Sequence, residues 1–282
     1  MNSARERGFI DIHSHFLPFF DDGAENYPQC LTTAEWYFKT GFEQVVATPH
    51  YIPGTRWKPT PARILAGIRQ AENMLKEHKI PLKILPGMEI MVTESICRDF
   101  DPAQFLSLGE QGFYLIEFPL HSPVSTPVLE KLHDLQSVAT LHFVIAHPER
   151  CNIFFDNREL LELLVGKGMV VQINIDSLLG LAGPKVQQQA LALLQAGQAH
   201  FLASDTHARE GRMPPDNKKI EQLIAVLGKE ATDQALKINP HRLLAGKKVD
   251  PIIPNGNIQL LAQLYAQQGG YMQRLKNIFT HH

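Results

Sequence analysis

The sequence predicts an α/β fold, arranged as a TIM-like barrel of parallel strands. Short β-rich runs alternate with longer segments of helical period, which is the pattern of successive βα units. Several of the short runs are apolar throughout, as expected of strands buried on both faces. The chain has 282 residues, of which 44% are hydrophobic, and a barrel of this kind needs roughly 250 residues. We therefore expect one globular domain with a substantial core.

The pattern contains about seven candidate strands. They are expected near residues 9–13, 44–48, 82–89, 113–118, 142–147, 170–175 and 201–204. Between them, apolar residues at helical spacing predict helices with one buried face, for example at Ile64, Ile68, Ala71 and Leu75 and at Val186, Ala190, Leu193 and Leu194. Stretches rich in proline and glycine at 49–61 and 211–215 follow strand ends, where barrel enzymes carry functional loops.

The barrel is expected to span residues 1–249, with a C-terminal tail over residues 250–282. The tail begins with Pro251 and Pro254 and then repeats apolar residues at helical spacing from Ile258, which predicts an appended helix. The terminal pair His281 and His282 is typical of a purification tag.

The composition argues against several kinds of partner and location. The formal net charge is -2, with 27 Lys and Arg against 29 Asp and Glu, so nucleic acid is not expected as a partner. The first residues lack the apolar run of a secretion signal, and no stretch is long enough to span a bilayer. We expect a cytoplasmic protein without membrane insertion, while an oligomer is left open. Cys30, Cys97 and Cys151 lack CxxC spacing, which argues against disulfides and a thiolate zinc site.

Side chains that bind metals follow the expected strands. The first strand ends in Asp11-Ile12-His13-Ser14-His15, where two imidazoles two positions apart can chelate one ion. The next loop and the later strand ends supply more imidazoles and carboxylates, at Asp22, His50, Glu89, Glu117, His147, Asp205 and His207. One such residue would be weak evidence, because rim and capping residues are often His or Glu. Coincidence across six strand ends instead favours a metal centre.

The remaining polar residues receive ordinary structural interpretations. Asp21 is interpreted as a turn residue beside the ligand Asp22, and Glu149 as a solvated loop charge. Eight histidines lie away from the donor-bearing strand ends and are expected to be solvated: His78, His121, His133, His142, His200, His241, His281 and His282.

The donor set contains imidazole and carboxylate without thiolate, which suits Mn²⁺, Zn²⁺ or Fe²⁺. Nine donor residues exceed what one ion needs, so two or three ions that share bridging carboxylates are the economical interpretation. Adjoining ions activate water and stabilise phosphoryl oxygens. Arg150 and Arg212 stand close in sequence to His147 and His207, and a guanidinium fork there could hold a phosphate.

Together these motifs resemble the PHP (polymerase and histidinol phosphatase) superfamily of trinuclear metal phosphoesterases, over about residues 9–244. Within it, the segments IDIHSH, DDG, ATPH, PGMEI, IEFP, IAHPER and ASDTH are similar to the manganese-dependent protein tyrosine phosphatases of bacterial capsule and exopolysaccharide operons. The segment Asn239-Pro240-His241-Arg242 resembles their closing motif. Met213 departs from the family pattern, since it splits the usual Gly-Arg-Pro-Pro.

The resemblance implies a distorted (β/α)7 barrel with three divalent ions, most often Mn²⁺ with Fe or Zn as alternatives. It implies an enzyme that removes phosphate from tyrosines in the tail of a cognate bacterial tyrosine kinase. The first ion would bind His13, His15, Glu89 and Asp205; the second Glu89, Glu117 and His147; the third Asp22, His50 and His207. Arg150 and Arg212 match the phosphate-contacting arginines, and are the candidate catalytic and substrate-binding residues.

The sequence gives less support to four other functions. A cysteine-based phosphatase needs an arginine six positions after its thiolate, and these positions hold Trp36, Ala103 and Asn157. A histidinol-phosphate phosphatase of the same superfamily is the nearest enzymatic alternative, and a PHP exonuclease would need a basic surface. The alternative that is not an enzyme is a kinase-binding scaffold with a vestigial metal site, which the intact donor set argues against.

Overall fold

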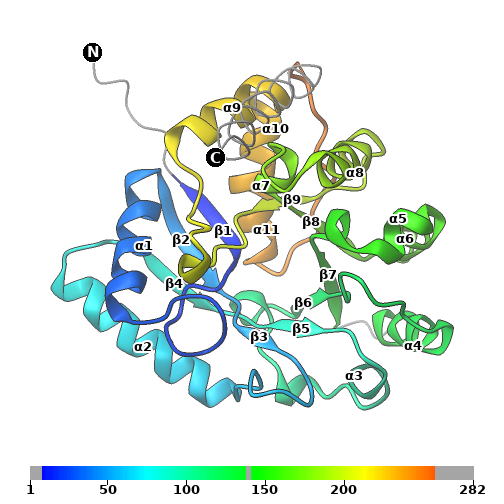
Figure 1. The fold of residues 1–282 in the computed structure, drawn as a ribbon, viewed down its shortest axis with the longest axis horizontal. Helices are drawn as coiled ribbons and strands as arrows, with labels where there is room; N and C mark the ends of the chain where they lie inside the picture. Colours follow the sequence, from blue (N-terminus) through cyan, green and yellow to red (C-terminus); the bar gives the residue numbers. More distant parts are fainter. Residues whose placement is uncertain (1–7, 138–140, 258–282) are drawn as a thin grey trace, which may run out of the picture.

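The computed structural model describes residues 8–137 and 141–257, and its elements confirm a mixed α/β fold with parallel strands (Figure 1). The strands lie in the middle of the molecule, and the longer helices surround them. The strands are β1 Phe9–Ser14, β2 Phe42–Ala47, β3 His50–Tyr51, β4 Lys83–Pro86, β5 Glu89–Met91, β6 Phe113–Glu117, β7 His142–Ala146, β8 Val170–Asn174 and β9 Phe201–Ala203.

These strands form two parallel sheets, with the orders β1-β2-β4 and β3-β5-β6-β7-β8-β9. The sheets meet where β1 passes β9, through a bridge between Ser14 and Thr206 and a hydrogen bond from the amide of Asp205 to the carbonyl of His13. The ladders of the described strands do not close into one continuous ring. The parallel α/β part of the prediction is thus confirmed, whereas barrel closure stays an interpretation.

The strand expected over residues 82–89 is wrong as a single element. It divides into β4 and β5, with Gly87 and Met88 between them. The partner strand breaks at the same level, because Thr48 and Pro49 separate β2 from β3. Proline lacks the amide that a ladder requires, so both strands change sheet together. The short pair β3 and β5 begins with His50 opposite Glu89, which places two expected metal ligands side by side.

The longer helices begin with recognisable caps. Thr60 accepts a hydrogen bond from the amide of Arg63 and precedes Pro61, so side chain and ring start the helix together. Asn26 and Asp216 cap their helices in the same way. The helices are α1 Tyr27–Lys39, α2 Pro61–Glu77, α3 Glu94–Arg98, α4 Thr126–Gln136, α5 Asn152–Asp156, α6 Arg158–Gly166, α7 Ile175–Leu178, α8 Pro184–Gln195, α9 Asn217–Leu227, α10 Lys229–Asp233 and α11 Asn239–Leu243.

The core has two parts, and the predicted helix faces contribute to the larger one. Ile64, Ile68, Ala71 and Leu75 of α2 are buried in the layer between helices and strands. A smaller apolar cluster is built mainly from alternate strand residues: Ile10, Ile12, Val46, Leu108, Phe113, Leu115, Val144, Ala146, Phe201, Ala203, Leu243 and Val249. This inner cluster supports the strand ends from below, so the polar residues beyond it are held by a packed base.

The first part of the tail is attached to the main body. Ile252 is fully buried and its amide donates to the carbonyl of Ala199, while the amide of Asn255 donates to Leu227. The terminal helix expected from Ile258, together with His281 and His282, lies outside the described residues. Within the described ranges, no helix is both long and apolar enough to cross a membrane.

His200 was expected to be solvated, and this is wrong. Its side chain is buried beside β8, where Nδ1 accepts the amide of Val171. Because burial disfavours the imidazolium, the pKa of His200 falls to about 4 from a usual value of 6.5. The signal that could have revealed it is its place just before the apolar strand β9.

This histidine predicts a pH dependence of stability. Between pH 6.5 and 4 the unfolded chain binds a proton at His200 that the folded chain excludes. The contribution of neutral His200 to the free energy of unfolding is therefore complete above pH 6.5 and is lost as the pH falls toward 4. The effect is at most about 3 kcal/mol. In His200→Asn the amide oxygen can still accept from Val171. Its free energy of unfolding, measured with urea in the presence of chelator, should fall less across this pH range than that of the wild type. His142→Asn is the control. Equal slopes of the free energy of unfolding against pH in all three proteins would contradict the prediction.

Candidate metal centre

The nine donors expected from the sequence come together at the carboxyl ends of the strands. Within the described residues they fall into four overlapping groups whose ligand atoms lie within 4.8 Å of one another. The groups are His15 with Asp22, His50 and His207; His13 with His15 and Asp205; His13 with Glu89 and His147; and His50 with Glu89 and Glu117. Shared members make this one centre, which we call the nine-donor centre.

An irregularity in β1 turns His13 toward this centre, together with His15 just after the strand. Asp11 pairs with Val45 and Ser14 with Ala47, so three residue steps in β1 oppose two in β2. A bulge of this kind re-aims the side chains that follow it. Asp11 accordingly faces α1, where it accepts from the hydroxyl of Tyr37, although His13 two positions later faces Glu89.

The Asp21-Asp22-Gly23 turn holds the other side of the centre. The Asp21 carboxylate accepts from Nδ1 of His15 at 2.7 Å, from the His50 amide at 2.9 Å and from the Gly23 amide at 2.9 Å. Asp21 is therefore a turn residue, as expected, but it also orients two expected metal ligands. A Cβ on Gly23 would lie 2.0 Å from the carbonyl oxygen of His15, so only glycine allows this close approach.

Two of the donors have left-handed backbone conformations. His147 has a φ of 31° and Asp205 a φ of 50°. Each comes just after a strand, β7 or β9, so an abrupt change of direction brings the side chain over the strand ends. Residues other than glycine adopt this region at a cost of order 1–3 kcal/mol, usually at functional sites.

Hydrogen bonds fix which ring nitrogen of three histidines faces the centre. The Nδ1 atoms of His13, His15 and His207 meet Gln172 Oε1 at 2.8 Å, Asp21 Oδ2 at 2.7 Å and the Asp205 carbonyl at 2.9 Å. Each partner is an oxygen acceptor, so each Nδ1 carries the proton. The Nε2 lone pairs then point inward, as metal-binding imidazoles require.

Two amides of β8, which sequence reasoning missed, connect these ligands. Gln172 accepts from His13 and donates from Nε2 to Asn174 Oδ1 at 2.7 Å. Asn174 in turn donates from Nδ2 to Asp205 Oδ2 at 2.8 Å. This β8 amide relay is buried and ties the ligand from β1 to the ligand after β9. Polar residues two apart in an otherwise apolar strand, Val-Val-Gln-Ile-Asn, were the available signal.

The Asp205 carboxylate divides its two oxygens between different tasks. Oδ2 accepts from Asn174 at 2.8 Å, from Arg150 at 2.7 Å and from Arg212 at 3.1 Å. Oδ1 faces His13, His15 and His207 at 3.4 to 3.5 Å and has no hydrogen-bond partner. One oxygen is therefore anchored, and the other is directed at the centre.

The residues present fit divalent ions. Of the buried side-chain atoms without a hydrogen-bond partner, five belong to the nine donors: Asp22 Oδ1, His50 Nδ1, Glu89 Oε2, His147 Nδ1 and Asp205 Oδ1. Unpaired buried polar atoms are costly, and a shared cation would satisfy carboxylate oxygens and imidazole lone pairs that face one another. The donor set lacks sulfur, which favours manganese, iron or zinc over a thiolate site.

The electrostatics of the centre point the same way. Burial, followed by repulsion from Glu89, raises the pKa of Glu117 to about 8. Burial would also raise the pKa of Asp22, but the hydrogen bond and charge of His207 lower it to about 2. Carboxylates packed this closely repel one another until a cation or protons neutralise them. Metal binding there is expected to compete with protons.

Arg150 and Arg212 line a pocket of about 490 Å³ at the edge of the centre, together with Leu120, His121, Asn174, Asp176, Ser177, Leu181, Ala182, Val186, Ser204 and Glu210. We call it the arginine-fork pocket. Its volume lies in the usual range for small-ligand sites, about 300–1,000 Å³. Both guanidinium groups are partly exposed while held on Asp205, so they can meet an anion beside the donors.

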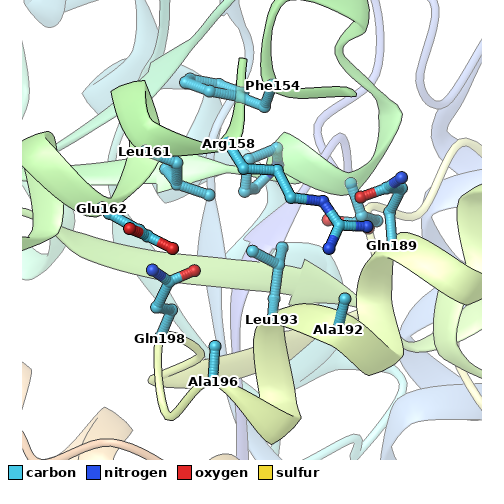
Figure 2. A pocket seen from close by; sticks show the side chains of 11 residues that line it. Phe154, Arg158, Leu161, Glu162, Gln189, Ala192, Leu193, Ala196 and Gln198 are labelled. Carbon is cyan, nitrogen blue, oxygen red and sulfur yellow. The ribbon is translucent and has the colours of Figure 1, made fainter. Parts of the chain in front are cut away.

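A second cavity lies on the outer side, between α6 and α8 (Figure 2). Leu161, Leu193 and the aliphatic part of Arg158 line it, and its volume of about 60 Å³ suits a few waters rather than a substrate. Glu149, which reaches its inner wall, was expected to be solvated, and this is wrong. The carboxyl is buried, accepts the amide of Asn174, and has its pKa raised by burial to about 7.

The three cysteines are buried free thiols. Burial raises the pKa of Cys30 to about 12 and that of Cys97 to about 11, and it raises that of Cys151 as well. The thiolate needed for a cysteine-based reaction is therefore disfavoured at each position.

The β8 amide relay yields a prediction about metal affinity. Asn174→Ala removes one anchor from Asp205 and the partner of Gln172, and partners of metal ligands typically contribute 10- to 100-fold in affinity. Metal content after dialysis against increasing concentrations of chelator should show an about 10- to 100-fold lower metal affinity. Gln187→Ala removes a buried amide that donates to Leu178 on the outer layer and serves as control. Unchanged metal affinity in Asn174→Ala would show that the relay is only structural.

Nine potential metal ligands at the carboxyl ends of parallel strands, with two arginines beside them, are typical of an α/β metal-dependent enzyme that acts on anionic substrates. The chain belongs to the capsular polysaccharide synthesis family CpsB/CapC, whose sequence model matches residues 9–245. This confirms the resemblance to the phosphatases of capsule operons.

Individual relatives agree with this assignment. The tyrosine-protein phosphatase YwqE of Bacillus subtilis is 37% identical over 222 residues, which cover 78% of this chain and 84% of the relative. A chain from the crystal structures of YwqE and of Streptococcus pneumoniae CpsB, metal-dependent tyrosine phosphatases, superposes with a TM-score of 0.77 at 34% identity, covering 87% of this chain and 98% of that one. A histidinol phosphate phosphatase from Lactococcus lactis, with a TM-score of 0.50 and 18% identity over 87% of this chain and 100% of that one, shares the fold.

Proposed function

We propose that the protein is a metal-dependent phosphatase that hydrolyses phosphotyrosine in proteins. The observation that carries the proposal is the shared boundary of the nine-donor centre and the arginine-fork pocket at Asp205. Its Oδ1 faces three imidazoles, while its Oδ2 binds both arginines. A phosphate held by the arginines would lie against the metal ligands. The similarity to YwqE and CpsB, which are tyrosine phosphatases by name, supports the same activity.

The centre is proposed to hold three divalent ions, manganese above iron or zinc. One ion would bind His13, His15, Glu89 and Asp205, the second Glu89, Glu117 and His147, and the third Asp22, His50 and His207. The four geometric groups of donors support this division only in part, because His15 also groups with the third set and His50 with Glu89 and Glu117. When bound, the ions supply activation of water and stabilisation of charge on phosphoryl oxygens.

The protein's own side chains bind and orient the phosphoryl group. Arg150 and Arg212 present planar donor groups that match the oxygens of a phosphate. Leu120 and Leu181 line the same pocket and offer apolar surface for an aromatic ring. A tyrosyl oxygen leaves readily, because the phenol has a pKa near ~10 and needs less help from an acid than an alkyl alcohol does. These features together favour an aryl phosphate.

The natural substrate is proposed to be the phosphotyrosine tail of a cognate bacterial tyrosine kinase, with capsular or exopolysaccharide synthesis as the regulated process. The match to a capsular polysaccharide synthesis family supports this context. The catalytic unit is proposed to be a single barrel over residues 1–249, carrying residues 250–282 as a tail.

The test is activity after removal and replacement of the metals. Protein stripped with chelator should be inactive on phosphotyrosine peptides, and Mn²⁺, Zn²⁺ or Fe²⁺ added separately should restore turnover to different extents. Histidinol phosphate and a phosphoserine peptide are the comparison substrates. A higher kcat/KM on histidinol phosphate than on phosphotyrosine peptides would indicate that the protein is a histidinol-phosphate phosphatase instead. Absence of turnover with all metals, in protein shown to contain them, would support a binding protein instead.

A further inference from the structure

A third pocket lies beside the Asp21-Asp22-Gly23 turn, and the proposed reaction does not use it. Its volume is about 380 Å³, and it is lined mainly by aromatic and arginine side chains: Phe19, Phe20, Trp57, Arg56, Arg63 and Arg209. The loop between β1 and α1, dark blue in Figure 1, lies beside α2 and forms one wall. We call this the arginine-aromatic pocket.

The pocket adjoins the nine-donor centre through two residues. Asp21 lines the pocket, and its carboxylate binds Nδ1 of His15 at 2.7 Å. Trp57 also lines the pocket, and its ring stacks on that of His50 with centroids 5.5 Å apart and an interplanar angle of 13°. A peptide whose phosphotyrosine reaches the centre would therefore pass close to this pocket, since an extended chain advances roughly 3.3 Å per residue.

Two arginines of the pocket, Arg56 and Arg209, are available to a ligand. None of Arg56, Arg63 and Arg209 forms an ion pair with a carboxylate in the described part of the chain. Of the two carboxylates in the lining, Asp21 is occupied by His15 and by two backbone amides, and Glu25 is exposed at the rim. In a molecule of net charge -2, this local excess of positive charge would attract anions.

The walls of the pocket are held in place before any ligand binds. Arg63 donates from Nη2 to the carbonyl of Phe19 at 3.0 Å, and its guanidinium lies 4.8 Å from the centre of the Phe20 ring. Phe19 has a φ of 70° and remains 58% exposed, packed edge-on against Tyr27. The left-handed backbone of this bulky residue and the exposure of its apolar ring both cost free energy. Such backbone conformations cluster at binding sites.

We infer that the arginine-aromatic pocket is a substrate subsite that binds an anionic side chain of the peptide near its phosphotyrosine. Arg56 and Arg209 would hold the anionic oxygens, while Phe19 and Trp57 would pack against the stem of the side chain. Two sources share this chemistry, a carboxylate of Glu or Asp and the phosphate of a second phosphotyrosine. The inference rests on the proposed function, because it supposes that a phosphotyrosine peptide occupies the centre.

The test measures binding separately from turnover. Three peptides carry a non-hydrolysable phosphonate analogue of phosphotyrosine, flanked within three residues on both sides by Glu, by Gln or by a second phosphotyrosine analogue. Fluorescence anisotropy with the metal-loaded protein should show at least about tenfold tighter binding of a doubly anionic peptide than of the Gln peptide, a difference of about 1.4 kcal/mol. The Glu and second-phosphonate arms then distinguish the two sources.

Variants of Arg56 and Arg209 test whether the arginine-aromatic pocket causes the preference for anionic peptides. Arg56 and Arg209 are exposed and make no side-chain hydrogen bond given for the described residues, so Arg56→Gln with Arg209→Gln should fold normally. The affinity ratio between anionic and Gln peptides should fall to about one in this double variant, and Arg56→Glu with Arg209→Glu should invert it. Arg69→Gln is the matched control, because Arg69 is exposed on the same helix as Arg63 but outside the pocket.

The outcomes separate the inference from the proposed function. Equal affinity for all three peptides, or a preference that persists in the double variant, overturns the subsite while the phosphatase assignment stands. If no peptide binds and none of the corresponding phosphopeptides is hydrolysed, the proposed function fails and the subsite fails with it.

Discussion

Asp205→Ala is expected to reduce kcat/KM on phosphotyrosine peptides by at least about 10³-fold, equivalent to about 4 kcal/mol. Asp205 Oδ1 faces the Nε2 atoms of His13 and His15, and its loss would leave these two rings without the carboxylate that groups with them. His13→Ala should have a comparable effect, since His13 belongs to two of the four donor groups. Metal content by mass spectrometry and steady-state kinetics on each variant are the measurements.

Controls separate loss of a ligand from loss of a fold. Asp99→Ala and His78→Ala change exposed residues of the same types, and both should keep metal content and turnover. Circular dichroism should show that Asp205→Ala and His13→Ala keep their secondary structure. Full activity together with full metal content in either ligand variant would remove that residue from the centre.

Arg150→Ala is expected to lower kcat/KM by roughly 10²-fold or more, about 3 kcal/mol. Arg150 binds Asp205 Oδ2 and lines the arginine-fork pocket, so its guanidinium would lie beside a bound phosphate. Arg150→Lys should recover part of the loss, because an ammonium keeps the charge without the planar, two-pronged geometry. Metal content should be retained, since Asn174 and Arg212 still anchor the same oxygen.

Arg209→Ala is the matched control for this experiment with a peptide that lacks other anionic residues, because Arg209 lies outside the arginine-fork pocket. Near-normal kcat/KM in Arg150→Ala would reduce Arg150 to a residue that holds Asp205. A large loss of metal would likewise place its main role in positioning that ligand.

The convergence of the nine expected donors could be predicted from the sequence because their positions follow from strand periodicity. Parallel strands end at one edge of a sheet, and Glu117 ends β6, while His50 and Glu89 follow the ends of β2 and β4 by three residues. These residues therefore converge, although His50 and Glu89 begin the short strands β3 and β5 that the sequence did not predict. The same rule could not predict the bulge in β1 or the left-handed backbones of His147 and Asp205. Those features depend on contacts between distant segments, including the bridge between Ser14 and Thr206.

Buried polar residues were the main failure of sequence reasoning. Glu149, His200, Gln172 and Asn174 look like surface residues by type, and only the fold shows that backbone amides and other side chains satisfy them. The division of 82–89 into β4 and β5 also escaped prediction. Its apolar pattern continues across Gly87 and Met88, while the hydrogen-bond partner changes.

The left-handed backbones at His147 and Asp205 cost stability at residues that the proposed reaction needs. Glycine at either position would adopt the same conformation without the cost that a side chain incurs there. A library selected for survival at high temperature should therefore enrich glycine at His147, whereas a library selected for turnover should reject it. At Asp205 this gain is offset, because glycine would leave Asn174, Arg150 and Arg212 without their shared acceptor. Position 147 would therefore report which of the two selections had been applied.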